Sequence, residues 1–478
     1  MACSISGYIT TAWNDSIAET LTQIIVNAED RGRDSFGIIG VEPSYEVFKT
    51  VGAPSSYTKE IRNFLKKTHP TLVINNNRAE PTTEFVHKKT WEDIQPFTSS
   101  HKSIIVSHNG TIANDKQLAT KYGLTPHTHI DSAVLPLLLE YYMTQGKTLL
   151  EAIKTLVKEV VGSYALAIAD ANNPHVLYLV TNYKPLAMYH RETTSYNAIY
   201  FSSFPEYLTE EPFVGVEEIK PYTITEITLN RNNNINVYTY SFAPLPHKTA
   251  LVVVSGGLDS VTVAYYLRSQ KYDITLLHFN YQQQATSAEL LAVKSLARDL
   301  SCPLITLDSS IFQFMPSTLT TQGTINKTRT GMDGAEFAHE WVPARNLIFL
   351  SIAVGIAESR GISFIALGNN LEESGAYPDN EMIFIRKLNE VLPFATQVNK
   401  SVQILQPLGN LMKHEIVKLG LQLGIPYEKT WSCYEPGVEK HGKLQPCNAC
   451  GPCYMRRVAF EINNTKDPLL QSGFDIHE

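Results

Sequence analysis

The chain has 478 residues, of which 43% are hydrophobic and 18% charged, and its formal net charge is −7. This length exceeds one ordinary core, so we expect a globular protein with two or more domains and little extended disorder. No apolar run is long enough to span a bilayer, and the opening residues MACSISGYIT lack a secretory signal, which predicts a cytoplasmic protein without a membrane segment. The sequence holds no dense Lys/Arg block, which disfavours a nucleic-acid partner without excluding one.

The first half is predicted to be rich in strands. Apolar residues recur at helical spacing after Asn14 and Asp15, until Arg31-Gly32, which predicts a helix that these two residues can cap. Two more helical stretches lie within 131–160, on either side of Gln145-Gly146. Short β-rich runs lie at 38–39, 103–106, 164–168, 176–180 and 199–201, and a hairpin is predicted from 223–229 and 235–240.

The pattern changes after the Pro-containing segment FAPLPHK, so we place the domains at 1–245 and 246–478. From about 249, strands alternate with helices, which predicts a doubly wound α/β domain with a parallel sheet and its ligands beyond the carboxyl ends of the strands. The Thr/Gly-rich stretch within 312–338 is too long and polar for an ordinary connection, and it is interpreted as a mobile loop over the site.

A glycine-rich turn joins the first strand of this second half to a helix. Its glycines let backbone N–H groups approach an anion, and the helix N-terminus adds a favourable partial charge. The turn reads SGGLDS and resembles the N-type ATP pyrophosphatase loop, which implies ATP with Mg²⁺ as a co-substrate. Its residues are Ser255, Gly256, Gly257, Leu258, Asp259 and Ser260.

Four of the six cysteines gather near the C-terminus, at Cys433, Cys447, Cys450 and Cys453. In a cytosolic chain this spacing indicates a metal rather than disulfides. Four thiolates complete a tetrahedral set, so we predict a structural Zn²⁺ with no open position for catalysis. An iron–sulfur cluster and reduced free cysteines are the alternatives.

Motifs across 249–461 make the second half similar to the QueC family: HFNYQQ, WVPARNLIFLSIAVGIAE, LGNN, AYPDN, TWSCY and CNACGPCYMRRVAF. The resemblance implies ATP- and ammonia-dependent conversion of 7-carboxy-7-deazaguanine to the nitrile through the amide. The chain departs from the family pattern at the YQQ residues of HFNYQQ and at Asn370, Glu372 and Glu373. These departures leave the details of the substrate open. The resemblance places these residues at the nucleotide or deazaguanine: Arg345, Asn346, Tyr377, Pro378 and Asp379.

The first half resembles class II glutamine amidotransferase domains, through Cys3, RGRDSFGI, NNNRAE, SHNGTIAN, Asp131-Ser132 and VGSYALAI. This resemblance implies a four-layer αββα fold with a cysteine nucleophile. The Cys3 thiol would attack the glutamine amide, and Asn109 with the Gly110 N–H would stabilise the oxyanion. Arg78 would hold the glutamine carboxylate and Asp131 its α-ammonium group.

One residue departs from the amidotransferase pattern. Ala2 lies between Met1 and Cys3, so removal of Met1 alone would not expose the amine of the nucleophile. Four explanations are open. Met1 and Ala2 are both removed, Ala2 is absent from the native protein, the Cys3 thiol acts without its own amine, or the glutaminase has lost its activity.

The two halves together resemble the Gat-QueC fusion group. We therefore expect glutamine- and ATP-dependent amidation of 7-carboxy-7-deazaguanine, through an adenylate and the amide, to 7-cyano-7-deazaguanine. The close alternative converts the 7-cyano group to an amidine, as an archaeosine synthase does, on the free base, tRNA or DNA. An asparagine synthetase-like enzyme would not explain the cysteine quartet, and the intact SGGLDS disfavours a non-catalytic zinc-bearing binding protein. Glutamine, ATP and a 7-deazaguanine are the expected small-molecule partners, and a homodimer stays open.

Overall fold

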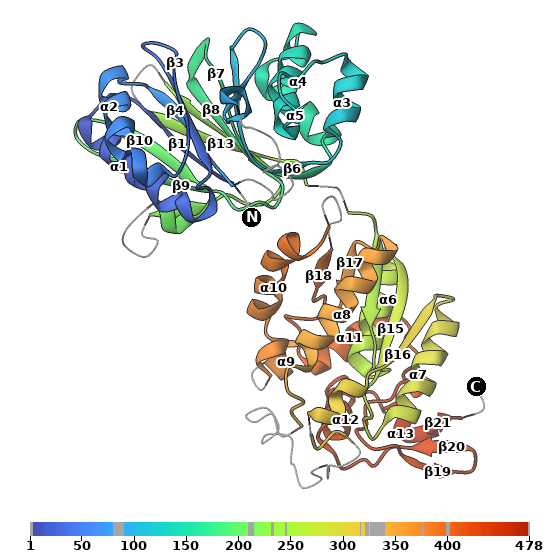
Figure 1. Ribbon diagram of the computed structural model, residues 1–478. Helices are drawn as coiled ribbons and strands as arrows, with labels where there is room; N and C mark the ends of the chain where they lie inside the picture. The colour runs from blue at the N-terminus through green and yellow to red at the C-terminus, as the bar shows by residue number, and fades with distance from the viewer. Residues whose placement is uncertain are drawn as a thin grey trace. The chain divides into compact units, whose positions relative to one another are not determined.

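The computed structural model describes residues 3–79, 90–208, 215–230, 234–243, 246–315, 317–320, 325, 340–374, 377–397 and 402–476. The chain divides into two compact units, Met1–Ala243 and Pro244–Glu478 (Figure 1). Within the ranges given, no helix combines the length and apolarity that a membrane crossing requires. All six cysteines lie in these ranges, and each is free of a disulfide.

Two antiparallel sheets form the centre of the first unit. One sheet contains β1 (Ser4–Thr10), β2 (Ser35–Val41), β3 (Glu46–Val51), β4 (Leu72–Arg78), β9 (Ala187–Glu192), β10 (Asn197–Ser202) and β11 (Val216–Glu218), in the order β11-β9-β10-β1-β4-β2-β3. The other contains β5 (Phe97–Thr98), β6 (Ile104–Ile112), β7 (Gly162–Asp170), β8 (Asn173–Thr181), β12 (Thr223–Leu229) and β13 (Ile235–Ser241), in the order β13-β12-β8-β7-β6-β5.

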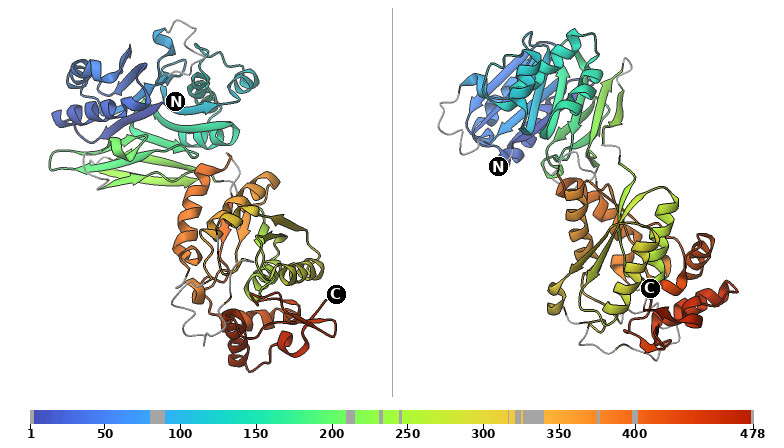
Figure 2. Two further views of the ribbon diagram at one scale, coloured as in Figure 1. Left: turned by 60° about the horizontal axis from the view of Figure 1, so that its bottom comes forward. Right: turned by 90° about the vertical axis from the view of Figure 1, so that its right-hand side faces the viewer.

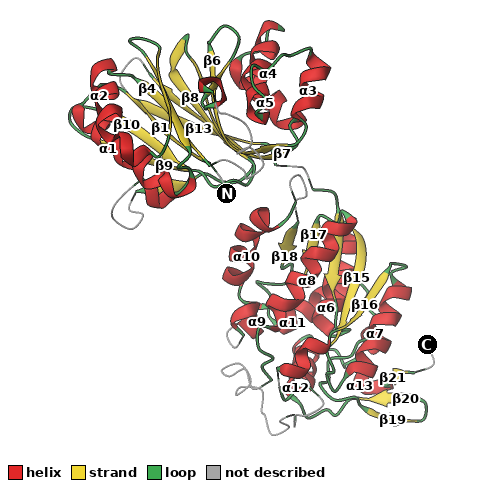
Figure 3. Cartoon of the chain, in the orientation of Figure 1, coloured by secondary structure: helices red, strands yellow, loops and turns green. Residues whose placement is uncertain are grey.

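Strand periodicity explains how each sheet is covered on both faces. Along β1, Ile5 and Ile9 pack between the two sheets, whereas Tyr8 packs with the helices on the outer face. The first sheet is covered by α1 (Asp15–Asn27) and α2 (Thr58–Thr68), and the second by α3 (Asp115–Tyr122), α4 (Val134–Thr144) and α5 (Leu149–Glu159). Figure 3 shows these helices outside the paired sheets, so the predicted αββα layering is confirmed.

Local sequence signals account for several elements of this unit. Asn14 caps α1, because its side-chain oxygen accepts a hydrogen bond from the Ser16 N–H at 2.9 Å. The predicted hairpin is confirmed as β12 and β13, with Thr225 opposite Thr239. The central strands β1 and β4 were not predicted as strands, since Ser, Gly and Asn are weak strand formers and tertiary pairing decides their conformation.

The second unit contains a parallel sheet of five strands in the order β16-β15-β14-β17-β18. The strands are β14 (Thr249–Val253), β15 (Asp273–Asn280), β16 (Leu304–Asp308), β17 (Phe364–Ala366) and β18 (Gln403–Leu405). One face packs against α6 (Leu258–Ser269), α7 (Thr286–Asp299) and α11 (Lys413–Gln422), and the other against α8 (Arg345–Arg360) and α10 (Met382–Ala395). The predicted doubly wound architecture is confirmed, with a short α9 (Leu371–Ser374) after β17.

The C-terminal segment gathers at one end of the second unit, as the red ribbon in both views of Figure 2 shows. It contains α12 (Gly451–Ile462), α13 (Pro468–Ser472) and a small antiparallel sheet of β19 (Val438–Lys440), β20 (Lys443–Gln445) and β21 (Phe474–Asp475). The loop predicted at 312–338 lies mostly outside the described residues, which include 312–315, 317–320 and 325 of it.

Candidate functional site

The SGGLDS turn connects β14 to α6 in a conformation that requires glycine. Gly256 has φ of +82°, and a Cβ there would lie 2.7 Å from Cβ of Ala292. Gly257 occupies the N-cap of α6, so the N-terminus of the helix, with its favourable partial charge for an anion, faces the turn. The Ser260 hydroxyl donates a hydrogen bond to the Gly257 carbonyl at 3.2 Å, which ties the turn to the helix.

A cavity of about 230 Å³ opens at the carboxyl ends of the parallel strands, where a doubly wound sheet binds its ligands. Five of the six residues predicted for ATP line it: Ser255, Gly257, Leu258, Asp259 and Ser260. Arg345 and Asn346 line it as well. Asp379 instead supports the start of α8, because its Oδ2 accepts a hydrogen bond from the Asn346 N–H at 3.1 Å. Tyr377 and Pro378 precede Asp379 in the same turn and are not among the lining residues.

Lys413 links two carboxylates at the floor of this cavity. Its Nζ lies 2.6 Å from Oδ2 of Asp259 and 2.9 Å from Oε1 of Glu373, and the Lys413 side chain is 10% exposed. Burial raises the pKa of Asp259 to about 6, and Lys413 opposes that rise. Burial acts to lower the pKa of Lys413, but the two carboxylates outweigh it and hold that pKa above its ordinary value. Oδ1 of Asp259 is buried and has no hydrogen-bond partner within the described residues.

The C-terminal segment is fastened to the phosphate loop. The Trp431 N–H donates to the Gly256 carbonyl at 2.8 Å, and the Leu258 N–H donates to the Ser432 hydroxyl at 3.3 Å. Arg456 is 3% exposed and binds Asp467 through two hydrogen bonds of 2.7 and 2.9 Å. These bonds make the TWSCY segment one wall of the cavity.

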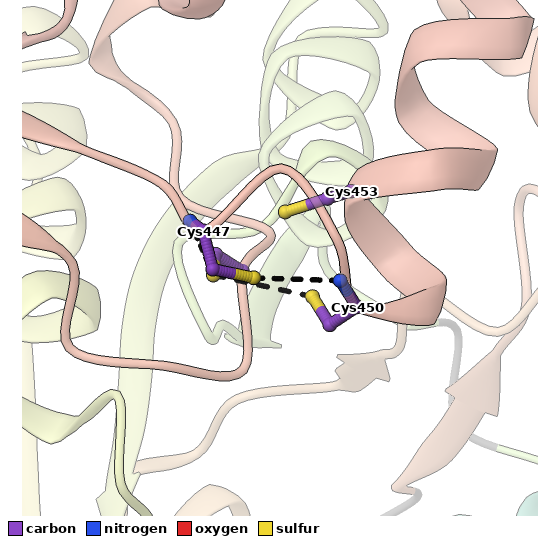
Figure 4. Close-up of side chains that lie close together, drawn as sticks. Cys447, Cys450 and Cys453 are labelled. Carbon is purple, nitrogen blue, oxygen red and sulfur yellow. Dashed lines mark hydrogen bonds between the residues drawn. The ribbon is translucent and has the colours of Figure 1, made fainter. Parts of the chain in front are cut away.

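The four C-terminal cysteines converge into one cluster. Figure 4 shows Cys447, Cys450 and Cys453 pointing toward one another beside the start of α12. With Cys433 they place four sulfur atoms within 4.8 Å of one another. The Cys450 N–H donates to the Cys447 sulfur at 3.4 Å, an arrangement typical of thiolate ligands. The cluster is therefore able to hold a metal ion.

In the first unit, pairing of β1 with β4 brings Cys3 close to Arg78. Ser4 pairs with Asn77, so the residues on either side of this pair are neighbours. The Cys3 thiol donates a weak hydrogen bond to the Ala79 carbonyl at 3.9 Å, and Arg78 is 5% exposed. The predicted nucleophile and the predicted carboxylate-binding residue thus lie at the same end of the first sheet.

Asn109 and Gly110 reach this place from the second sheet, on β6. Nδ2 of Asn109 donates to the Ser203 hydroxyl at 3.5 Å, and the same hydroxyl accepts the Ile5 N–H at 3.0 Å. Ser203 therefore connects the predicted oxyanion residue to the strand that follows Cys3. Gly110 has φ of +148°, and a Cβ there would lie 1.9 Å from the Ser163 carbonyl oxygen, so no other residue fits.

Asp131 and His108 make hydrogen bonds that hold the end of β6 in place. Asp131 accepts hydrogen bonds from the Ile112 N–H at 2.6 Å and the Ser132 N–H at 2.7 Å. His108 bonds to the Ser132 hydroxyl at 2.6 Å, and burial lowers the pKa of His108. Sequence reasoning missed Ser203, His108 and Lys413. The adjacency of His108 to Asn109 was a signal for His108, and Lys413 lies within a stretch, 407–420, that also resembles QueC.

Comparisons with known proteins agree with this two-part arrangement. A glutamine amidotransferase domain model matches residues 83–210, and the model of queuosine biosynthesis protein QueC matches 249–464. The 7-cyano-7-deazaguanine synthase 2 of Sulfurisphaera tokodaii is 46% identical over 474 residues, covering 98% of this chain and 99% of that protein. The 7-cyano-7-deazaguanine synthase of Saccharolobus solfataricus is 45% identical over 479 residues, with the same coverage. A synthase of that name from a Nitratiruptor species is 36% identical over 220 residues, which are 46% of this chain and 97% of its own.

Proposed function

The chain belongs to the family that joins a class II glutamine amidotransferase domain to a QueC domain, and from this premise we propose that it converts 7-carboxy-7-deazaguanine to 7-cyano-7-deazaguanine. Glutamine supplies the nitrogen and ATP supplies the activation. We place the reaction in the cytoplasm. The substrate in this proposal is the free base, since the net charge of −7 offers no general attraction for a nucleic acid.

The observation that carries this proposal is the intact phosphate loop beside the buried Lys413 cation. A carboxylate is a poor electrophile, so its oxygen first attacks the α-phosphorus of ATP and pyrophosphate leaves. In this proposal the N-terminus of α6 stabilises the departing charge, and Lys413 offsets the negative charge of Asp259 and Glu373 in the same cavity. Ammonia then displaces AMP to give the amide. A second ATP activates the amide oxygen in the same way, and loss of AMP and a proton gives the nitrile.

The first unit supplies the ammonia in this proposal. The Cys3 thiol attacks the amide carbon of glutamine, and Nδ2 of Asn109 with the Gly110 N–H stabilises the oxyanion. Arg78 and Asp131 are assigned to the carboxylate and the α-ammonium group of glutamine. The buried position of Arg78 beside Cys3 supports this assignment.

We assign zinc to the cysteine cluster. Four sulfur atoms within 4.8 Å fit a tetrahedral ion with Zn–S bonds of about 2.3 Å, and four protein ligands leave no position for a reacting water. Cys433, Cys447, Cys450 and Cys453 would hold the ion, whose contribution is structural. It would fix the cavity wall that Trp431 and Ser432 form. Metal analysis that finds iron with a sulfide chromophore would replace zinc with a cluster.

The reaction is tested by offering the carboxylate and the nitrile separately to the purified protein with glutamine and ATP, and by identifying products by mass spectrometry. We expect amide and nitrile from the carboxylate, with release of AMP and pyrophosphate. Asp259→Ala and Ser260→Ala should lose AMP formation but keep glutamine hydrolysis. Amidine formed from the nitrile without ATP, and unaffected by these substitutions, would overturn the proposal.

The source of the ammonia is tested by Cys3→Ala. Glutamine-supported turnover should fall to background, whereas turnover with a high concentration of ammonium salt should stay close to that of the wild type. The intact mass of the wild-type protein tells whether Met1 and Ala2 are removed before Cys3. Loss of both activities in a folded Cys3→Ala protein would contradict the separation of the two chemistries.

A further inference from the structure

Glu289 differs from the other carboxylates of the synthetase cavity. Among the described residues, three carboxylates line this cavity, and two of them, Asp259 and Glu373, share the single cation of Lys413. Glu289 makes no ion pair with a lysine or arginine in the part of the chain that the structure describes. Its Oε2 accepts a hydrogen bond of 2.7 Å from Nε2 of Gln283, a neutral donor. A carboxylate offers about four acceptor positions, so Glu289 keeps acceptor capacity for a ligand.

The carboxylate is held in place by a side chain that is itself fixed. Gln283 is 4% exposed, and its Oε1 accepts the Tyr281 N–H at 2.9 Å. Its Nε2 donates to the Phe279 carbonyl at 3.2 Å as well as to Glu289. Both polar atoms of the Gln283 side chain are therefore bonded, which fixes the amide that donates to Glu289. Such pre-organisation is typical of a binding site rather than of a solvated surface acid.

The surroundings of Glu289 fit a flat, uncharged group. The rings of Phe279 and Phe349 line the same cavity and stack on each other at 4.1 Å, and Tyr281 lines it beside them. Arg345 also lines the cavity and acts electrostatically on Glu289. A divalent cation bound to Glu289 would be repelled by this guanidinium, whereas a neutral N–H donor would not be.

We propose that Glu289 accepts the two N–H donors on the pyrimidine edge of the 7-deazaguanine, the ring N–H and the 2-amino group. This assignment rests on the proposed function. A guanine-type edge presents two adjacent donors, which match the two oxygens of a carboxylate. Adenine presents one amino donor flanked by ring-nitrogen acceptors, which would face the carboxylate with like charge. Glu289 therefore selects the deazaguanine base and does not read ATP.

The test compares the natural substrate with 7-carboxy-7-deazahypoxanthine, which lacks only the 2-amino group. The wild type should lose roughly 10- to 100-fold in kcat/KM on the analogue, because a charged hydrogen bond is missing. Glu289→Gln should lose a similar factor on the natural substrate, and it should discriminate much less between the two. The KM for ATP should be unchanged in this variant.

Glu390→Gln is the matched control, because Glu390 is exposed on α10 and its ion pair among the described residues is with Lys387 at 2.7 Å. It should keep the wild-type discrimination. Equal use of both substrates by the wild type would overturn the assignment even if no Glu289 variant folds. An increased requirement for ATP or Mg²⁺ in Glu289→Gln would overturn it as well, by moving Glu289 to the nucleotide. A wild type that makes no amide or nitrile from either compound would refute the proposed reaction itself, which is a separate result.

Discussion

The two proposed reaction centres of this chain are built in different ways. The glutaminase centre lies on neighbouring strands, where pairing of Ser4 with Asn77 and the strand β6 determine which residues meet. The synthetase centre instead joins side chains from separate segments, since Lys413 lies 154 residues after Asp259 and 40 after Glu373. Strand register determines which residues meet in the first centre, whereas ion pairs of Lys413 with Asp259 and Glu373 hold the second together. Substitutions should therefore damage them through different mechanisms.

The largest effect is expected from removing a ligand of the proposed zinc site. Structural zinc in small sites contributes about 10 kcal/mol or more of apparent binding free energy, so Cys450→Ser should lower metal content and soluble yield together. AMP formation should be lost, while glutamine hydrolysis by the first unit persists. Metal analysis and AMP release measure the two outcomes. Cys302→Ser is the control, because Cys302 lies outside the cluster and should keep a full metal content.

Lys413→Met should have the next largest effect. Removing the cation leaves two partly buried carboxylates without a counter-charge, and we expect a loss of about 3 kcal/mol in the free energy of unfolding, the lower end for buried pairs, because the Glu373 side chain is 34% exposed. ATP-dependent amidation should also fall to background. Lys429→Met is matched to it, because the partly exposed Lys429–Asp299 pair at 3.4 Å contributes about 1 kcal/mol or less. Equal losses of unfolding free energy for both variants, measured by calorimetry, would show that the Lys413–Asp259–Glu373 cluster stabilises the fold no more than a partly exposed ion pair does.

Gly110→Ala tests the dependence of the glutaminase centre on its backbone. A Cβ would lie 1.9 Å from the Ser163 carbonyl in a conformation that disfavours side chains, so we expect a loss of roughly 2 to 4 kcal/mol. Glutamine hydrolysis should fall, with amidation from ammonium salt retained. Gly123→Ala also has positive φ, but open space surrounds it, and about 1 kcal/mol is expected there.

The smallest effect concerns pH and sharpens the description of the synthetase cavity. Burial raises the pKa of Glu289 to about 7, opposed by Gln283 and Arg345, so this carboxyl is increasingly protonated below pH 7. A protonated carboxyl loses acceptor capacity. The KM for the deazaguanine should therefore rise up to tenfold per pH unit below about 7 and level off above it.

Substrate-dependent exchange of pyrophosphate into ATP is the suitable measurement, because it needs no ammonia. Asp259 has a pKa raised to about 6 by burial, so it titrates separately in the same cavity. Glu289→Gln should keep a transition near 6 and lack the one near 7. The same KM profile in the variant and the wild type would remove Glu289 from substrate recognition.

Features encoded in short stretches of sequence were predictable. The SGGLDS turn, the cysteine spacing and the change from a strand-rich half to alternating strands and helices each depend on neighbouring residues. The Lys413 triad and Ser203 were not predictable, because their partners are brought together only by the fold. Ser203, for example, binds the Ile5 N–H across 198 residues. The roles of Tyr377 and Pro378 stay predictions, whereas Asp379 contacts α8 rather than the cavity.

The hydrogen bond from Trp431 to the phosphate loop has a consequence for biosynthesis on the ribosome. Domains fold from the N-terminus as the chain emerges, so the first unit is complete when only half of the chain has been translated. The cavity wall beside the SGGLDS turn depends on hydrogen bonds of Trp431, Arg456 and Asp467, which are translated well after the first unit. A stalled or truncated product would therefore contain a finished glutaminase with an open nucleotide site. If the first unit has the proposed glutaminase activity, such fragments would release ammonia without an acceptor.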